Sequence, residues 1–236
     1  MTVPHPAAMN PIAELGEFFA LPTAEGDSWL PILTLCNDAA VAREYARRAQ
    51  SAIAASMRVD VADVPIKAAA SSVHLSIAAR LLSPVIGAAT CLATFPLLSA
   101  KNVFWQQSST HRMELGVADA ELATVTGPRQ SANAIADSLI GDVFRPLNET
   151  MRLATALSQK VLWGNIASAA NGAVTVLSQS RPADEPRGRA LVAALIATGP
   201  LRDAAEILDG QFRRRNCCLF YQVPGAGYCG DCVLTE

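Results

Sequence analysis

The feature that most constrains this chain is the spacing of the cysteines near its C-terminus. Four of the six cysteines lie between Asn216 and Glu236, in the pattern C-C-x10-C-x2-C. The turn Cys229–Cys232 can aim two thiolates at one metal centre. Cys217 and Cys218 are adjacent, and neighbouring side chains in an extended segment point in opposite directions. This pair therefore suits a sharply bent backbone, or a centre larger than one atom such as a 2Fe-2S cluster held by four thiolates.

Two runs around these cysteines resemble a known protein family. Arg215–Tyr221 and Cys229–Cys232 are similar to the C-terminal signature of the FhuF-like ferric-siderophore reductases, which are 2Fe-2S proteins with this unusual spacing. A third run, Leu162–Asn165, resembles a motif that recurs in the same proteins. The resemblance implies that the ligands of the 2Fe-2S cluster are Cys217, Cys218, Cys229 and Cys232.

The resemblance also implies an activity. It is that of a cytoplasmic ferric-siderophore reductase, which transfers one electron from the 2Fe-2S cluster to siderophore-bound Fe(III) and releases Fe(II). The substrate would be a ferric siderophore, and the electron would come from a donor protein or reductant that the sequence does not identify. No covalent bond need be broken, so the chain needs no catalytic residues beyond the cluster ligands.

Other interpretations of the cysteines stand beside this one. Structural zinc sites usually carry two C-x2-4-C pairs, whereas this chain has one. Disulfides are rare in a reducing compartment, which we expect because Met1–Asn10 lacks the basic region and apolar core of an export signal. The alternatives are a one-electron carrier without its own siderophore site and a zinc-stapled binding protein without redox activity. A large apolar pocket in the helical domain would count against the carrier.

The amino-acid composition and net charge limit the kinds of partner that the protein can bind. Hydrophobic residues make up 51% of the chain and charged residues 17%, and a net charge of -2 argues against a broad attraction to nucleic acid. Leu81–Leu98 is uncharged and near the lower length limit for a membrane-spanning helix. Pro84, Gly87 and Pro96 interrupt it, so we interpret it as a buried helix. We expect a cytoplasmic protein with at most peripheral contact at the inner face of the plasma membrane.

The periodicity of apolar residues predicts a mainly α fold with a small β-hairpin (α+β), consisting of a helical domain plus a C-terminal iron-sulfur segment. We divide the chain into a flexible N-terminus (1–10), a helical siderophore-binding domain (11–208) with a hairpin near 102–117, and a 2Fe-2S cluster-binding segment (209–236). Several helix boundaries are also predicted. They are a cap at Asn37 or Asp38 with a helix to about Met57, a helix from Val64 to about Leu82, a restart at Pro84, a break near Arg145–Pro146, a linker over Arg181–Gly188 and a last helix over Leu201–Leu208.

Residues near the cysteines are expected to tune the cluster. The positive field of Arg213–Arg215 would raise its reduction potential, and Gly225, Gly227 and Gly230 would allow backbone N–H groups to approach sulfur. The aromatic side chains of the segment would exclude water on one side; these are Phe220, Tyr221 and Tyr228.

The remaining histidines and cysteines have simpler interpretations. His74, on an alanine-rich helix, is more often a hydrogen-bonded core residue than a ligand or proton donor. Cys36 and Cys91 lack a partner at metal-binding spacing and are interpreted as small buried hydrophobes. His111, at the tip of the predicted hairpin, is a weaker candidate for contact with a ligand.

Overall fold

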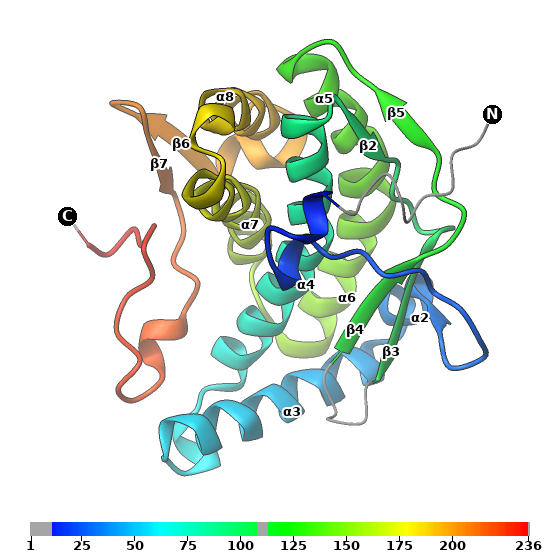
Figure 1. Ribbon diagram of the computed structural model, residues 1–236. Helices are drawn as coiled ribbons and strands as arrows, with labels where there is room; N and C mark the ends of the chain where they lie inside the picture. Colours follow the sequence, from blue (N-terminus) through cyan, green and yellow to red (C-terminus); the bar gives the residue numbers. More distant parts are fainter. Residues whose placement is uncertain (1–10, 108–112, 236) are drawn as a thin grey trace.

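The computed structural model describes residues 11–107 and 113–235, so that His111 lies outside the described residues. The fold is mainly helical α+β with small sheets, as the sequence predicted. Figure 1 shows a helical body with α4 at its centre, a small sheet at one side and the C-terminal segment, drawn orange to red, along another. The long helices are α3 (Ala39–Met57), α4 (Ile66–Cys91), α7 (Gln159–Ser180) and α8 (Glu185–Ile196).

Helix α3 forms where the sequence predicted it. The Asp38 carboxylate accepts hydrogen bonds from the backbone N–H of Ala40 at 2.7 Å and of Val41 at 3.3 Å, which satisfies two donors that the first turn leaves free. The helix ends at Met57, and Arg58 closes it in the left-handed conformation with φ of 57°. The short α2 (Ile32–Asn37) precedes it.

Helix α4 corrects two predictions. We expected a stop at Leu82 and a new helix from Pro84, but α4 runs unbroken through Pro84 and ends at Cys91. A proline inside a helix costs about 3 kcal/mol, because it removes one backbone hydrogen bond and crowds the preceding turn. That cost is offset here by tertiary packing, since Leu81, Leu82 and Ile86 are fully buried. Helix α4 is long and apolar enough to cross a membrane, yet 72% of its most apolar window is buried inside the protein.

The middle of the chain is more continuously helical than predicted. Helix α5 (Pro128–Ile135) passes through a π-helical stretch (Ala136–Phe144) directly into α6 (Arg145–Thr155). The expected break at Arg145–Pro146 is therefore wrong: the proline lies in the first turn of α6, where its missing N–H is tolerated. The actual break is at Ala156, which has φ of 54°.

Three small sheets complete the fold, whereas the sequence predicted one hairpin. That hairpin is confirmed: β3 (Val103–Gln107) pairs antiparallel with β4 (Met113–Val117), and β1 (Leu30–Pro31) adds to its other edge. The second sheet pairs β2 (Thr94–Pro96) with β5 (Leu122–Thr124). The third pairs β6 (Ala205–Leu208) with β7 (Gln211–Arg214).

The β6–β7 hairpin replaces the last predicted helix. Leu201–Leu208 contains only part of a short 3-10 turn (Gly199–Asp203) before β6 begins. Asp209 and Gly210 join the strands with φ of 51° and 77°, the backbone that a two-residue hairpin turn requires. The predicted boundary at 208/209 therefore falls within this turn. The predicted linker over Arg181–Gly188 is also largely structured, because α8 begins at Glu185.

After β7 the chain runs back across the helical body. Figure 1 shows the C-terminal segment passing beside α7 towards the lower ends of α3 and α4. There Val223 joins a small separate core with Ala54, Val64, Ala68 and Ala69. The partly buried Leu219 and Phe220 pack against the same core, so the segment is fastened to α3 and α4 by apolar contacts.

Candidate metal centre

The adjacent cysteines lie at a sharp bend, one of the two conditions that their spacing required. Leu219, directly after Cys218, adopts a left-handed conformation with φ of 70° and starts a short 3-10 turn. Cys218 and Cys232 are buried at 6% and 8% exposure, and Cys217 and Cys229 are half-buried. The bend therefore lies beside two of the four thiols, and all four are at least partly shielded from water.

The sulfur positions are suited to metal binding. The Sγ atoms of Cys218 and Cys229 are 3.7 Å apart. Two thiolates on one tetrahedral metal, with bonds of about 2.3 Å, lie about 3.8 Å apart, so this pair has the spacing of two ligands to the same metal atom. The backbone N–H of Leu219 donates to Cys217 Sγ at 3.3 Å, and that of Leu234 donates to Cys232 Sγ at 3.4 Å. These amides, rather than those of the glycines, approach the sulfurs.

The pKa values of the thiols are raised by burial and by the neighbouring cysteines. Burial raises the pKa of Cys217, and negative charge on Cys218 and Cys232 raises it further. The pKa of Cys229 is raised well above its usual range by burial, then by Cys218 and Asp231. Four thiolates in this space repel one another and need positive charge to hold them ionised. All six cysteines are free, which is the state in which they can bind metal.

The residues fit a 2Fe-2S cluster in number and chemistry. Two sulfurs already have the spacing of ligands to one metal atom, and the other two each accept a backbone N–H, which favours the thiolate. Across residues 11–107 and 113–235, no group of three or more His, Cys, Asp or Glu side chains is arranged to hold a single metal ion. When present, the cluster would be held by Cys217, Cys218, Cys229 and Cys232.

A buried arginine lies next to the cysteine segment. Arg214, at the end of β7, is 2% exposed, and its positive charge lowers the pKa of Cys217. Its Nη2 donates to Asn165 Oδ1 at 2.7 Å and its Nε donates to the Asn216 carbonyl at 3.0 Å. Both acceptors are neutral, and within the described part of the chain no carboxylate forms an ion pair with Arg214. A buried unpaired cation is costly, so a negative partner is expected nearby.

The Leu162–Asn165 motif now has a structural role. Asn165 is fully buried on α7 and donates its amide N–H groups to the carbonyl and hydroxyl oxygens of Ser71 on α4, both at 3.0 Å. Its Oδ1 is thereby aimed at Arg214. A Cβ on Gly164 would lie 3.0 Å from Arg214 Nη2, so the glycine makes room for the guanidinium. The motif positions the arginine that faces the cluster.

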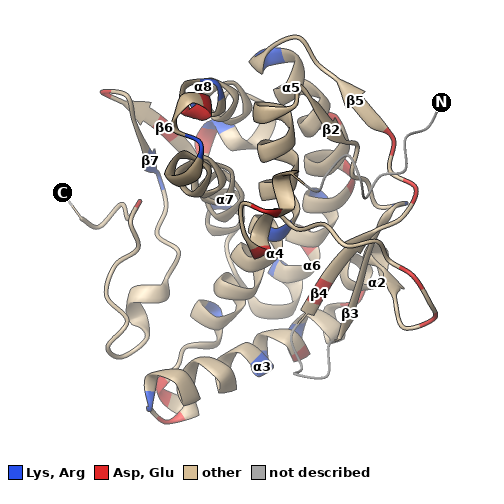
Figure 2. Cartoon of the chain, in the orientation of Figure 1, with Lys and Arg blue, Asp and Glu red and all other residues tan. Residues whose placement is uncertain are grey.

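The other two arginines of the run differ from Arg214. Arg213 is exposed, and Arg215 is exposed and forms an ion pair with Glu206 at 3.0 Å. Figure 2 shows basic residues on β7, where the chain enters the cysteine segment. Tyr221 and Tyr228 stack with ring centroids 6.3 Å apart but are 42% and 62% exposed, so the expected exclusion of water by these rings is not observed.

The isolated candidates behave as core residues. His74 is fully buried and its Nε2 lies 2.7 Å from Asn148 Oδ1. Burial lowers its pKa to about 4, a shift that the Asn148 hydrogen bond opposes and the Arg214 charge reinforces, so His74 is neutral. Cys36 is buried, and burial raises its pKa to about 12. Burial, and then Asp184, raises the pKa of the half-buried Cys91 to about 11. Neither thiol approaches the C-terminal cysteines closely enough for a contact.

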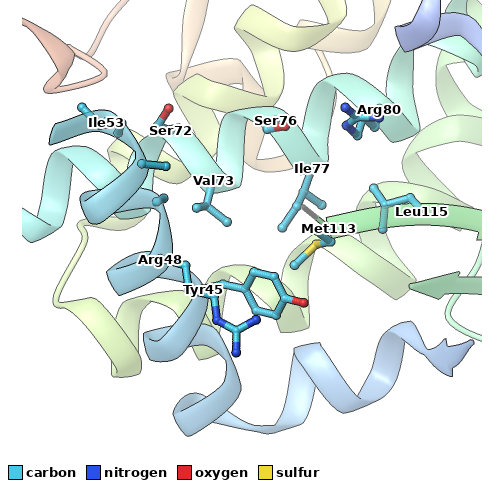
Figure 3. Close-up of a pocket in the computed structure, with 12 residues that line it drawn as sticks. Tyr45, Arg48, Ile53, Ser72, Val73, Ser76, Ile77, Arg80, Met113 and Leu115 are labelled. Atoms are coloured by element: carbon cyan, nitrogen blue, oxygen red, sulfur yellow. The ribbon is translucent and has the colours of Figure 1, made fainter. Parts of the chain in front are cut away.

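Two cavities of the structure have the size of small-molecule sites, and one of them borders the cysteine segment. One, of about 540 Å³, is formed by α3, α4 and β4. Figure 3 shows Tyr45 and Arg48 rising into it from α3, Val73, Ser76, Ile77 and Arg80 from α4, and Met113 and Leu115 from β4. The other, of about 780 Å³, lies between α7, α8 and the β6–β7 hairpin and is bordered by Gly230 and Asp231.

Comparison with known proteins agrees with the geometry. Residues 214–234 match the family model described as the FhuF 2Fe-2S C-terminal domain, which spans Arg214 and all four cysteines. A search of curated proteins found no match to the chain. The segment is thus similar to the FhuF 2Fe-2S C-terminal domain, which supports a 2Fe-2S cluster as its cofactor and suggests an iron-sulfur protein resembling the siderophore-iron reductases.

Sequence reasoning singled out the four cysteines of the matched segment and missed the residues around them. Asn165 was noted only as the end of a motif, and Ser71 was not noted. Ser168, whose hydroxyl hydrogen-bonds to Asp231 between two of the ligands, was also missed. The sequence signal that could have revealed the role of Asn165 was an asparagine close to a glycine on an otherwise apolar helix. Its partner is 49 residues away in sequence, which no local pattern reveals.

Proposed function

We propose that this protein is a cytoplasmic ferric-siderophore reductase that delivers one electron to a siderophore-bound Fe(III) and releases Fe(II). The observation that carries the proposal is the FhuF-type four-cysteine segment packed on the helical body beside cavities of ligand size. When bound, a 2Fe-2S cluster supplies a centre that accepts and donates single electrons.

The chain's own residues would set how readily that electron is accepted. Four thiolates, two sulfides and two ferric ions sum to a charge of about -2, which an added electron makes more negative. Arg214 provides a fixed positive charge at the buried side of the segment, and the amides of Leu219 and Leu234 donate to two of the sulfurs. Each of these contacts favours the reduced state and so raises the reduction potential.

The proposed reaction balances as one electron from a donor plus one Fe(III) chelate giving one Fe(II) chelate. The donor is a one-electron reductant or redox protein, as the family resemblance implies. Hard oxygen ligands of a siderophore favour the ferric ion, so reduction weakens their hold and iron leaves. No bond to carbon is made or broken, and the protein needs only to bind the chelate near the cysteine segment.

The alternative of a carrier without a substrate site is disfavoured by the cavity between α3, α4 and β4. A carrier that docks only to proteins has no need of a ligand-sized cavity of about 540 Å³. We further propose that the protein acts in the cytoplasm, at most peripherally associated with the inner face of the plasma membrane, where imported chelates arrive.

The test is a turnover assay on the iron-loaded protein. Reduced protein is mixed anaerobically with a ferric siderophore and a ferrous trap, and cluster oxidation and Fe(II) release are followed by absorbance. Equal amounts of oxidised cluster and trapped Fe(II) would support the proposal. Oxidation by a redox protein but by no ferric chelate would favour the carrier, and a colourless protein containing one zinc would exclude both.

A further inference from the structure

The cavity between α3, α4 and β4 carries an inference about the substrate, which rests on the proposed function. We propose that this cavity, defined by Tyr45, Arg48, Arg80 and the apolar side chains between them, is the binding site for an anionic, oxygen-rich ferric chelate. Its volume of about 540 Å³ lies in the usual range for small-molecule sites.

The charges of the cavity favour an anion. Arg48 and Arg80 are both lining residues, and among the described residues no Asp or Glu lines the cavity. Within the described residues Arg80 has no carboxylate partner, and its guanidinium lies 5.2 Å from the centre of the Phe18 ring. Glu44 pairs with Arg48 through Nε at 3.0 Å, which leaves the other nitrogens of that guanidinium for a ligand. Guanidinium groups are well suited to carboxylate and catecholate oxygens.

Two buried hydrogen-bond donors without partners are a second, independent indication that the cavity binds an anion. Tyr45 Oη and Arg48 Nη1 are both buried and have no hydrogen-bond partner among the described residues. Tyr45 is 7% exposed, and its ring is fixed edge-on against Trp105 at 5.3 Å and beneath the Arg48 guanidinium at 5.3 Å. Buried polar groups normally have partners, so these two unpaired donors, which lie between this cavity and a neighbouring one of about 470 Å³, indicate a missing acceptor.

The position of the cavity suits electron transfer. Ala49 and Ile53 line the cavity and also pack against the small core that holds Leu219 and Phe220 of the cysteine segment. A chelate in the cavity would therefore be separated from that segment by a wall of α3 and α4 side chains. The apolar lining of the cavity, from α3, α4 and β4, would contact the organic body of the chelate; it consists of Ile53, Val73, Ile77, Met113 and Leu115.

The larger cavity beside Gly230 and Asp231 is the competing site, and its charges make it the weaker one. Glu185 and Asp231 line it, and both are acidic. Its only lining arginine, Arg189, is already bound by Glu185 at 3.0 Å and by Asn171 Oδ1 at 2.6 Å. An anionic chelate would meet repulsion there with no free cation to compensate it.

The experiment measures binding without reduction. The probe is a gallium(III) tris-catecholate, which matches the ferric complex in charge and shape but does not accept an electron. Its affinity for the iron-loaded protein is measured by calorimetry for the wild type and for Arg48→Gln, Arg80→Gln and Tyr45→Phe. The matched control is Arg47→Gln, which removes the same charge from an exposed position on the same helix.

We expect Arg48→Gln and Arg80→Gln each to weaken binding about tenfold or more, and Arg47→Gln to leave it nearly unchanged. Wild-type affinity should fall as salt is raised, and less steeply in the arginine variants. An uncharged gallium(III) tris-hydroxamate should be less sensitive to both substitutions. Unchanged affinity in Arg48→Gln and Arg80→Gln would overturn the proposal, as would a loss on Arg189→Gln instead, which moves the site to the larger cavity.

The same variants separate this proposal from the proposed function. If the gallium chelate binds through the arginines but its ferric counterpart is not reduced, the site stands and the reductase fails. If the ferric chelate is reduced equally by the wild type and both arginine variants, the reductase stands and this site is wrong. EPR of each reduced variant confirms that the cluster is intact, so a weak binder is not mistaken for a misfolded one.

Discussion

The two sides of helix α4 are built from the same kinds of residue and are used differently. Towards α6 and α7, the polar groups of His74 and Ser71 are buried, and each contacts an asparagine: Asn148 on α6 for His74 and Asn165 on α7 for Ser71. Towards α3 and β4, Ser72, Ser76 and Arg80 follow one another at helical spacing along the wall of a cavity. One side is closed around a cation that faces the cysteine segment, and the other presents cations to a solvent-accessible volume.

This comparison shows that the burial of a polar side chain does not by itself indicate its role. On the closed side, Asn165 uses both its amide nitrogen and its oxygen within the protein and fixes Arg214 in place, although His74 Nδ1 and Asn148 Nδ2 have no partner among the described residues. On the open side, Tyr45 Oη and Arg48 Nη1 are buried without partners in the described structure. Substitutions on the closed side should therefore alter the cluster and stability, whereas those on the open side should alter binding.

The largest effect is expected from removing a ligand on the closed side. Cys218→Ser should abolish the 2Fe-2S absorbance, the EPR signal of the reduced protein and reductase activity together, because serine does not replace a thiolate in this pair. Iron and acid-labile sulfide assays measure the loss. Cys91→Ser, a half-buried cysteine outside the segment, is the control and should retain all of these. Full retention in Cys218→Ser would contradict its assignment as a ligand.

The next effect concerns stability against pH. His74 has a folded pKa of about 4, below the unfolded value of 6.5, so the unfolded chain binds more protons between these values. His74 should therefore lower the free energy of unfolding by about 2 kcal/mol as pH falls from about 6.5 to about 5. Denaturant unfolding at several pH values should show a shallower slope in His74→Gln. Equal slopes in the two proteins would mean that His74 is protonated or exposed in the folded state.

A smaller effect is expected from the buried cation. Arg214→Met should lower the reduction potential by about 60 mV or more, the equivalent of a tenfold change for one electron, because it removes a positive charge beside the thiolates. A potentiometric titration monitored by EPR measures it. Arg213→Gln, the exposed neighbour, should shift the potential far less, and Arg214→Lys should restore part of the loss. Equal shifts in Arg213→Gln and Arg214→Met would show that only the net charge matters.

The smallest effect tests whether the two sides are independent. Tyr45→Phe removes one hydroxyl and keeps the ring packed against Trp105. We expect a several-fold weaker affinity for the anionic chelate, as for loss of one hydrogen bond of about 1 kcal/mol, with no change in reduction potential. Calorimetry and potentiometry on the same sample provide the two readouts. A shift in potential would show that the cavity and the cluster are coupled.

Local patterns predicted the parts of the molecule that local physics determines. The Asp38 cap, the β3–β4 hairpin and the four cysteines were all found, because a capping carboxylate, alternating apolar residues and ligand spacing act over a few residues. The Asp209-Gly210 turn carried an equally local signal for a hairpin and was overlooked.

The sequence predictions were wrong or incomplete where tertiary packing determines the local structure. Pro84 lies inside α4 because the side chains around it are buried on every side, which the sequence near the proline does not show. The role of Asn165 depends on bringing α4, α7 and β7 together, and the cavity depends on how far β4 stands from α3 and α4. Such features follow from the assembled fold and not from spacing along the chain.

The solitary burial of Arg214 has a consequence for how the protein matures. Before iron and sulfide are delivered, its guanidinium is held out of water by Asn165 and Asn216 with no counterion, and the C-terminal segment closes over it at a cost. The arrival of a cluster with a charge of about -2 removes that cost. We therefore expect the chain with its cluster to be more stable towards unfolding than the chain without it.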